Sequence, residues 1–339
     1  MLQFNSLKLL SMSILLSGSI SIISAVSAQS IIKIDGSSTV YPITKAAADK
    51  FQIAKKNAIN VTVDISGSGG GFKKFCRGEI DIVNASRPIL KNEIKDCNNS
   101  RVQFVEIPVA FDALTVAVHP ENTWSTTMTV AELKKMWEPA AQGKITKWNQ
   151  INPAWPDESF KLYGADTDSG TFDYFTEAIV GKIKSSRNDF TESENDNVLV
   201  EGVARNKNGL GFFGFAYYIE DQTKVTAVAI NNGKGGVLPS VETVENGNYQ
   251  PLSRPIFIYV NAKATEKPEI KEFVEFYMKN AILLVKEAEF FPLPPRAYTT
   301  MMEHFNKKRV GTVFNGVSAV GLTIDELVRR EGRLEYDNY

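Results

Sequence analysis

The chain has few of the residues on which metal and covalent chemistry most often depend. Its 339 residues include two cysteines and two histidines, and neither His119 nor His304 has a cysteine or a second histidine at a metal-ligand spacing. Lysine and arginine form no long run and the net charge is −1, which argues against a nucleic-acid or membrane-surface partner. We therefore expect no metal, no cofactor and no nucleic-acid partner, and any bound anion must be attracted by a few local groups.

Long apolar runs are also lacking, except near the N-terminus. Lys8 is followed by an apolar and small-residue run over residues 9–23 and then by Ala25-Val26-Ser27-Ala28. This order is typical of a secretory signal peptide, although an uncleaved anchor helix is the alternative. Serines and a glycine within the run favour cleavage. We predict a signal peptide over residues 1–28, with the mature protein in the periplasm.

Export makes the two cysteines informative, because the compartment outside the inner membrane is oxidising. Cys76 and Cys97 are the only cysteines, so we predict that they form one disulfide bond. Two free buried thiols are the alternative.

Short β-branched runs alternate with helical stretches from residue 31 onward, which indicates an α/β fold. Strands are expected over residues 31–35, 60–65, 81–85, 102–109, 114–119, 160–164, 224–230 and 254–260. Helices are expected over residues 41–57, 71–78, 129–137, 171–181 and 267–280. A linker rich in serine, glycine or proline does not occur, which favours two lobes joined by paired strands. We expect lobe I to comprise residues 29–112 and 258–339, and lobe II to comprise residues 113–257.

Three motifs place hydroxyls and glycines between an expected strand and an expected helix. They are Asp35-Gly36-Ser37-Ser38-Thr39-Val40, Ser66-Gly67-Ser68-Gly69-Gly70-Gly71 and Asp166-Thr167-Asp168-Ser169-Gly170-Thr171. Helix N-termini expose unpaired N–H groups and attract anions, and glycine lets the backbone approach a ligand. One such motif alone is more often a helix cap or a turn. Three of them at the carboxyl ends of strands predict an oxyanion site.

Arg87 supplies a positive charge at the same expected edge, within Asn84-Ala85-Ser86-Arg87-Pro88. Its planar fork of donors suits an oxyanion, although a surface arginine before a proline turn is the alternative. The phosphate-loop pattern of nucleotide-binding proteins fails because Phe72 and Lys73 stand at its decisive positions, and the dinucleotide pattern fails at Phe72. The expected ligand is therefore a small anion without magnesium.

The same stretches carry a resemblance to a known family. GSSTVYP, SGSGGGFKKFC, NASRP and TDSGTFDYF occur in this order, and with the paired cysteines they resemble the phosphate-binding proteins of bacterial phosphate ABC transporters, in their cyanobacterial-type branch. The resemblance covers essentially all of the mature chain. It implies a type II periplasmic binding protein fold whose two lobes, joined by a paired-strand hinge, close over phosphate.

The resemblance also implies a set of phosphate ligands: Ser38, Thr39, Ser68, Ser169, Gly170 and Thr171. Arg87 stands where the best-known branch of the family has an aspartate, and the arginine that precedes the SGT motif in that branch is missing here. The carboxylate that would accept the proton of phosphate is therefore sought among Asp35, Asp166, Asp168 and Asp173, with Asp166 and Asp168 favoured because they are close to Ser169.

Taken together, these features predict a monomeric solute receptor that captures phosphate and delivers it to an ABC permease. A receptor for another tetrahedral oxyanion or a phosphate sensor is the alternative. A secreted phosphatase fits less well, because both histidines lie outside every motif.

Overall fold

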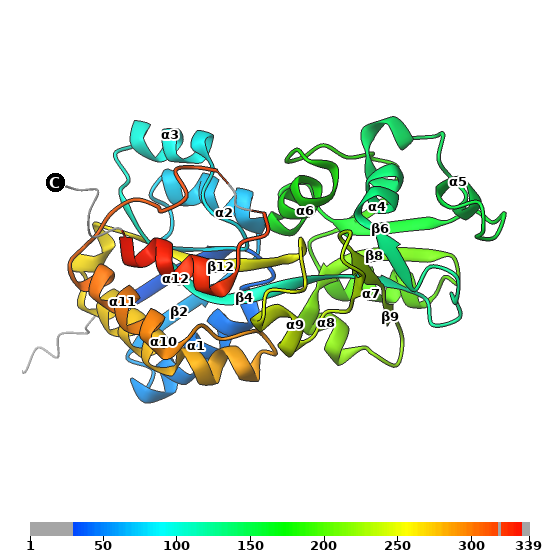
Figure 1. Ribbon diagram of the computed structural model, residues 1–339. Helices are drawn as coiled ribbons and strands as arrows, with labels where there is room; N and C mark the ends of the chain where they lie inside the picture. The colour runs from blue at the N-terminus through cyan, green and yellow to red at the C-terminus, as the bar shows by residue number, and fades with distance from the viewer. Residues whose placement is uncertain (1–29, 318–319, 334–339) are drawn as a thin grey trace, which may run out of the picture.

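A computed structural model describes residues 30–317 and 320–333, so the predicted signal peptide lies outside the described residues. Helices and strands gather into two groups, and two long strands, β4 (Phe104–Val118) and β12 (Ser253–Asn261), run from one group toward the other (Figure 1). We call the group that contains the N-terminal strand lobe I and the other group lobe II. None of the helices in the described residues has the length and apolar character needed to cross a membrane.

Lobe I combines elements from both ends of the chain. Its N-terminal part contains β1 (Ser30–Gly36), α1 (Tyr41–Ala54), β2 (Ile59–Val63), α2 (Gly67–Cys76), β3 (Ile82–Ala85) and α3 (Lys91–Asn99). Its C-terminal part contains η3 (Ala264–Glu266), α10 (Pro268–Glu287), α11 (Pro295–Asn306) and α12 (Ile324–Arg333). The two parts pack together through apolar helix faces, with Phe51 of α1 5.3 Å from Phe273 of α10 between ring centroids.

Lobe II is formed by the middle of the chain. Its helices are α4 (Val130–Trp137), η1 (Pro139–Ala141), α5 (Trp148–Ile151), α6 (Gly170–Phe175), the π-helical segment η2 (Thr176–Val180), α7 (Asp196–Ala204), α8 (Phe215–Glu220) and α9 (Val241–Glu245). Its strands are β5 (Thr127–Thr129), β6 (Lys161–Ala165), β7 (Thr191–Ser193), β8 (Gly209–Gly214), β9 (Thr226–Ala227), β10 (Ala229–Asn231) and β11 (Gly236–Val237).

One sheet continues through both lobes in the order β2-β1-β3-β12-β4-β8-β6-β7, and β9 also pairs with β4. β1 lies parallel to β2 and β3, and β6 lies parallel to β7 and β8, whereas β4 and β12 are antiparallel to each other. Each lobe therefore has parallel strands whose carboxyl ends lead into helices, which is where open α/β sheets bind ligands.

β4 corrects the sequence prediction, which placed two strands with a connection at residues 110–113. A single strand runs from Phe104 to Val118, because the backbone of Ala110 to Ala113 pairs with β12 from Ile256 to Ser253. From Leu114 onward β4 pairs with β8 instead. The strand thus changes partner where it passes from lobe I to lobe II.

The predicted strand over residues 224–230 is also corrected. The structure divides it into β9, which joins the large sheet, and β10, which joins a small sheet with β5 and β11. Val228 lies between β9 and β10, and its N–H donates to the carbonyl of Val116 in β4 at 2.8 Å. The chain leaves the large sheet and enters the small sheet at this residue.

The predicted disulfide bond between Cys76 and Cys97 is confirmed. It ties the end of α2 to α3, so the two helices that follow β2 and β3 are covalently joined.

Candidate anion-binding site

The three hydroxyl-glycine motifs lie where they were expected, at the carboxyl ends of parallel strands. The first connects β1 to α1, the second connects β2 to α2, and the third connects β6 to α6. α2 begins at Gly67, four residues before the predicted start, so the glycines of its motif form the first turn of the helix. α6 continues directly into the π-helical segment that ends at Val180.

The second and third motifs meet across the two lobes at two glycines. A Cβ atom on Gly67, whose φ is +73°, would lie 2.6 Å from the carbonyl oxygen of Asp168. A Cβ atom on Gly170 would lie 2.3 Å from the hydroxyl oxygen of Ser68 and 2.6 Å from that of Ser86. Any larger residue would therefore hold the lobes apart, which explains the need for glycine here.

Hydroxyls from both lobes gather at this contact. The Oγ1 atoms of Thr39 and Thr171 lie 3.1 Å apart although the residues belong to different lobes. The hydroxyl of Ser68 lies 3.2 Å from that of Ser86 and accepts a hydrogen bond from the Ser86 N–H. Ser169 caps α6, since its Oγ accepts from the Thr171 N–H at 3.1 Å.

Arg254 provides a buried positive charge among these hydroxyls, and the sequence analysis did not single it out. It is the second residue of the β12 hinge strand and donates to the Thr171 hydroxyl and to the Gly170 carbonyl, each at 2.9 Å. Its Nη2 also lies 3.4 Å from Thr39 Oγ1. One guanidinium thus contacts the first motif and the third.

Asp112 of β4 balances this charge. It accepts hydrogen bonds from Arg254 Nε at 3.1 Å and from Nη2 at 2.9 Å. Burial raises the pKa of Asp112, and the guanidinium opposes that rise. A signal for the pair was present, because Arg254 and Asp112 each stand as a lone charge in or beside an apolar strand pattern.

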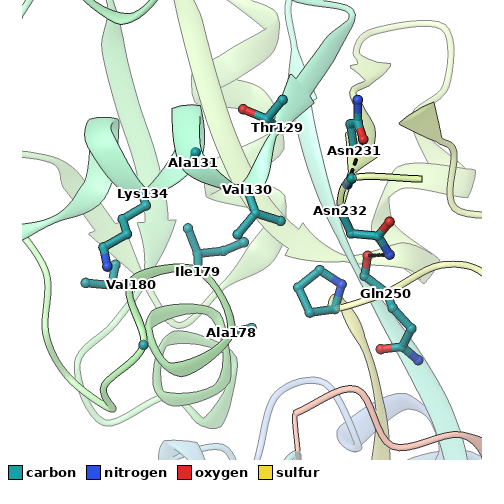
Figure 2. Close-up of a pocket in the computed structure, with 13 residues that line it drawn as sticks. Thr129, Val130, Ala131, Lys134, Ala178, Ile179, Val180, Asn231, Asn232 and Gln250 are labelled. Carbon is teal, nitrogen blue, oxygen red and sulfur yellow. Dashed lines mark hydrogen bonds between the residues drawn. The ribbon is translucent and has the colours of Figure 1, made fainter. Parts of the chain in front are cut away.

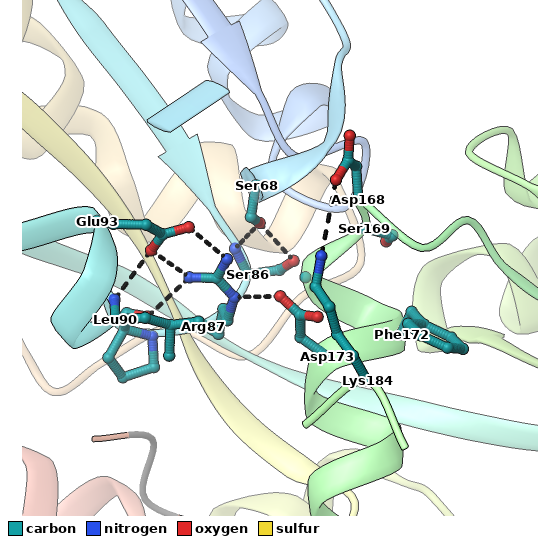
Figure 3. Close-up of polar contacts among 12 residues, drawn as sticks. Ser68, Ser86, Arg87, Leu90, Glu93, Asp168, Ser169, Phe172, Asp173 and Lys184 are labelled. Carbon is teal, nitrogen blue, oxygen red and sulfur yellow. Dashed lines mark hydrogen bonds and ion pairs between the residues drawn. The ribbon is translucent and has the colours of Figure 1, made fainter. Parts of the chain in front are cut away.

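Arg87 lies at the lobe boundary, with all three nitrogens of its side chain engaged by the protein (Figure 3). Nε donates to Asp173 at 2.7 Å, while Nη1 and Nη2 donate to the two carboxylate oxygens of Glu93 at 2.8 and 2.7 Å. Nη1 also reaches the carbonyl of Pro88. Burial alone would lower the pKa of Arg87, but Glu93 and Asp173 raise it above its ordinary value. A contact between Arg87 and a bound anion stays a prediction.

The four carboxylates considered as proton acceptors are engaged elsewhere. Asp35 pairs with Lys74 and Asp173 pairs with Arg87. Asp166 accepts from the backbone N–H of Asp168 at 2.8 Å. Asp168 is partly exposed and pairs with Lys73 at 3.0 Å and with Lys184 at 3.7 Å.

Glu194 and Asp196, between β7 and α7, are two further acids that the sequence analysis missed. Burial, with Asp196 as a secondary cause, raises the pKa of Glu194 to about 7, and the nearby Ser38 opposes this rise. Neither carboxylate oxygen of Glu194 has a hydrogen-bond partner among the described residues. Burial also raises the pKa of Asp196 to about 7. The carboxyl group of Glu194 is therefore close to its titration point at neutral pH, and it lies near the predicted ligand Ser38.

A separate hollow of about 740 Å³ lies on lobe II between α4, η2 and the loop before β12 (Figure 2). Lys134 is the charged residue in its lining, and apolar side chains such as Val130 and Ile179 form much of its wall. It contains none of the residues predicted to bind phosphate. In the described part of the chain, no His, Cys, Asp and Glu side chains are grouped so that they could hold a metal ion.

Comparisons with known proteins agree with this architecture. Residues 24–281 match the model of a PBP superfamily domain. SphX of Synechocystis is 52% identical over 90% of this chain and 90% of its own, and the phosphate-binding protein PstS of Staphylococcus saprophyticus is 35% identical over 79% and 82%. A crystal structure of a possible phosphate binding protein from Planctomyces limnophilus is 44% identical, covers 84% of this chain and 100% of its own, and superposes with a TM-score of 0.63.

Two α/β lobes, crossing strands and hydroxyl-rich helix starts at their junction define a type II periplasmic binding protein fold. Within the PBP superfamily, the chain belongs to the family that includes SphX and PstS.

Proposed function

We propose that this protein is an extracytoplasmic receptor that captures inorganic phosphate between its lobes and delivers it to an ABC permease, without catalysing a reaction. The observation that carries this proposal is the position of Arg254, which touches hydroxyl motifs from both lobes. The names of the relatives PstS and of the Planctomyces limnophilus protein support phosphate as the ligand. The signal-peptide pattern supports a periplasmic location.

The proposed ligand set consists of donors that need little net charge. It contains the N-terminal turns of α1, α2 and α6, with the ligands Ser38, Thr39, Ser68, Ser169, Gly170, Thr171 and Arg254. Asp112 offsets the charge of Arg254, so the net positive charge next to the anion is small. Hydroxyls and backbone N–H groups therefore supply most of the hydrogen bonds that replace water around the anion. The hydroxyls of Thr39 and Thr171 would separate to admit a phosphate oxygen.

The lobe division is part of the same proposal. Residues 29–112 and 258–339 form one lobe and residues 113–257 form the other, with β4 and β12 as the hinge. The change of β4 from β12 to β8 at Leu114 supports the first crossing point. Ligand binding then favours the closed arrangement, which the permease recognises.

Glu194 is the carboxyl group that we propose faces the proton of phosphate. Phosphate carries a proton at neutral pH, whereas sulfate does not, so an acid that shares one proton with the ligand favours phosphate. Two carboxylate oxygens without a hydrogen-bond partner in the described part of the chain and a pKa of about 7, which Ser38 influences, support Glu194 over Asp166 and Asp168, which are held by a backbone N–H and by lysines.

Isothermal titration of phosphate-stripped protein tests the proposal. One phosphate should bind per monomer, and sulfate and molybdate should bind at least about a hundredfold more weakly, a difference of about 3 kcal/mol. Tight binding of sulfate or molybdate with weak phosphate binding would assign the site to another oxyanion. Release of phosphate from an aryl phosphate in the presence of zinc or magnesium would overturn the assignment as a receptor.

A further inference from the structure

The ion pair between Arg87 and Asp173 joins the two lobes. Arg87 follows β3 of lobe I and Asp173 lies on α6 of lobe II, and the Nε–Oδ2 distance is 2.7 Å. The two side chains are 1% and 0% exposed, so the pair is excluded from water. Separating the lobes must break it.

Lobe I holds the arginine in place before the pair forms. Both carboxylate oxygens of Glu93 and the carbonyl of Pro88 accept from its Nη atoms, and the ring of Phe72 lies 5.6 Å from its guanidinium carbon. Glu93 belongs to α3, which the disulfide bond ties to α2. Nε is therefore the one side-chain nitrogen of Arg87 that contacts the opposite lobe.

Asp173 is paired with a charged residue of the opposite lobe, whereas Arg87 also pairs with Glu93 of its own lobe. Arg87 is the cation paired with its carboxylate among the described residues. Burying a carboxylate without a partner is costly, and the guanidinium compensates for part of the lost water by donating to Oδ2 of Asp173. Closure of the lobes therefore depends on this contact more than on an exposed pair.

We propose that Arg87 and Asp173 form a latch that sets the fraction of closed molecules, so that Arg87 controls phosphate affinity through closure and not by contact with the anion. This inference rests on the proposed function. Apparent affinity equals the intrinsic affinity of the closed form multiplied by the closed fraction, so loss of the latch weakens binding and speeds release.

The variant Asp173→Asn separates the latch from direct binding by the sign of its effect. If Arg87 contacts phosphate, removal of the competing carboxylate frees the guanidinium, and phosphate binds more tightly. If the pair is a latch, phosphate binds about tenfold more weakly or worse, since a buried ion pair becomes a hydrogen bond from a cation to a neutral amide. Asparagine keeps the shape of the side chain, and Arg87 keeps both contacts to Glu93, so lobe I retains its internal pairing.

A matched control uses the second ion pair across the lobes, between Lys73 and Asp168, whose side chains are 61% and 44% exposed. Lys73→Met should change the affinity less than about threefold, because exposed pairs contribute little. Stopped-flow kinetics should show that Asp173→Asn raises the dissociation rate while the association rate changes less than about threefold. The combination of Arg87→Gln and Asp173→Asn should weaken binding less than the product of the two single effects.

Unchanged or tighter phosphate binding by Asp173→Asn overturns the latch, as does an effect confined to the association rate. If the unaltered protein binds no phosphate, the proposed function fails, and small-angle X-ray scattering then decides on the latch alone. In that case Asp173→Asn must have a larger radius of gyration than the unaltered protein and Lys73→Met must not, and equal radii overturn the inference.

Discussion

Replacement of Arg254 by methionine should abolish tight phosphate binding while the lobes stay folded. Methionine keeps an unbranched side chain of similar length but removes the contacts to Thr171, Gly170 and Asp112. A hydrogen bond from a charged donor contributes about 1.5–3 kcal/mol, and Arg254 reaches both lobes. We therefore expect the affinity to fall at least about a hundredfold, measured by isothermal titration at pH 7.

The same variant leaves Asp112 buried without its cation, and this loss costs about 3–5 kcal/mol of unfolding free energy. Stability and binding are separated by the double variant Arg254→Met/Asp112→Asn, in which the orphaned charge is gone. Thermal and urea unfolding should show recovery of most of the lost stability in the double variant. Its phosphate affinity should remain as low as that of Arg254→Met.

Arg187 offers a matched control, because it is also a buried arginine paired with an aspartate. It pairs with Asp189 at 2.5 Å and donates to the carbonyls of Met136 and Ile145, all within lobe II. Arg187→Met should lower stability, by less than Arg254→Met because the Asp189 side chain is 36% exposed, and should leave the affinity within about threefold. The reasoning would be refuted if Arg254→Met/Asp112→Asn bound phosphate within threefold of the unaltered protein.

Three further outcomes follow from the structure. Glu194→Gln should reduce the preference for phosphate over sulfate by about 10- to 100-fold in competition titrations, because an amide does not share the phosphate proton; an unchanged ratio removes Glu194 from the site. Burial raises the pKa of Glu106 from its ordinary 4.5 to about 7, so its contribution to stability is present at acid pH and is lost as pH rises through about 7. Between pH 5 and 8 the free energy of unfolding in urea should therefore fall by up to about 3 kcal/mol more in the unaltered protein than in Glu106→Gln. Parallel pH profiles of the two proteins would contradict this. Replacement of Cys76 and Cys97 by serine should cost about 3 kcal/mol in the same assay, and dithiothreitol should then have no effect on the variant, whereas full stability without the bond contradicts the loop-entropy estimate.

Much of the fold could be predicted because its signals are local. The β-branched run at Ile31 lies in β1, and the apolar run from Arg254 to Val260 lies in β12. The hydroxyl of Thr129 caps α4, and Glu132 completes the capping box. β4 was divided wrongly, because a stretch with Asp112 at its centre looks like a connection until its partner is known. That partner, Arg254, is 142 residues away.

The candidate site was predictable to the same extent. The hydroxyl turns carry their own pattern, and the structure brings Thr39, Ser68, Gly170 and Thr171 together. Arg254 and Glu194 carry no local pattern, since strand pairing and lobe packing place them. The charge of Arg87 was read as available, and its capture by Glu93 and Asp173 depends on contacts that are visible only in three dimensions.

The two strands that cross between the lobes also carry the buried pair Arg254 and Asp112. A point on the axis of a hinge moves least when the arms swing. If the lobes rotate about these two strands, the guanidinium moves little, whereas the serine and threonine turns, which lie farther out in each lobe, move more. An arriving anion can meet this charge while the lobes are apart, and each arm then adds its hydroxyls as it swings inward. Capture would thus proceed outward from the hinge, with the charge first and the hydrogen bonds after it.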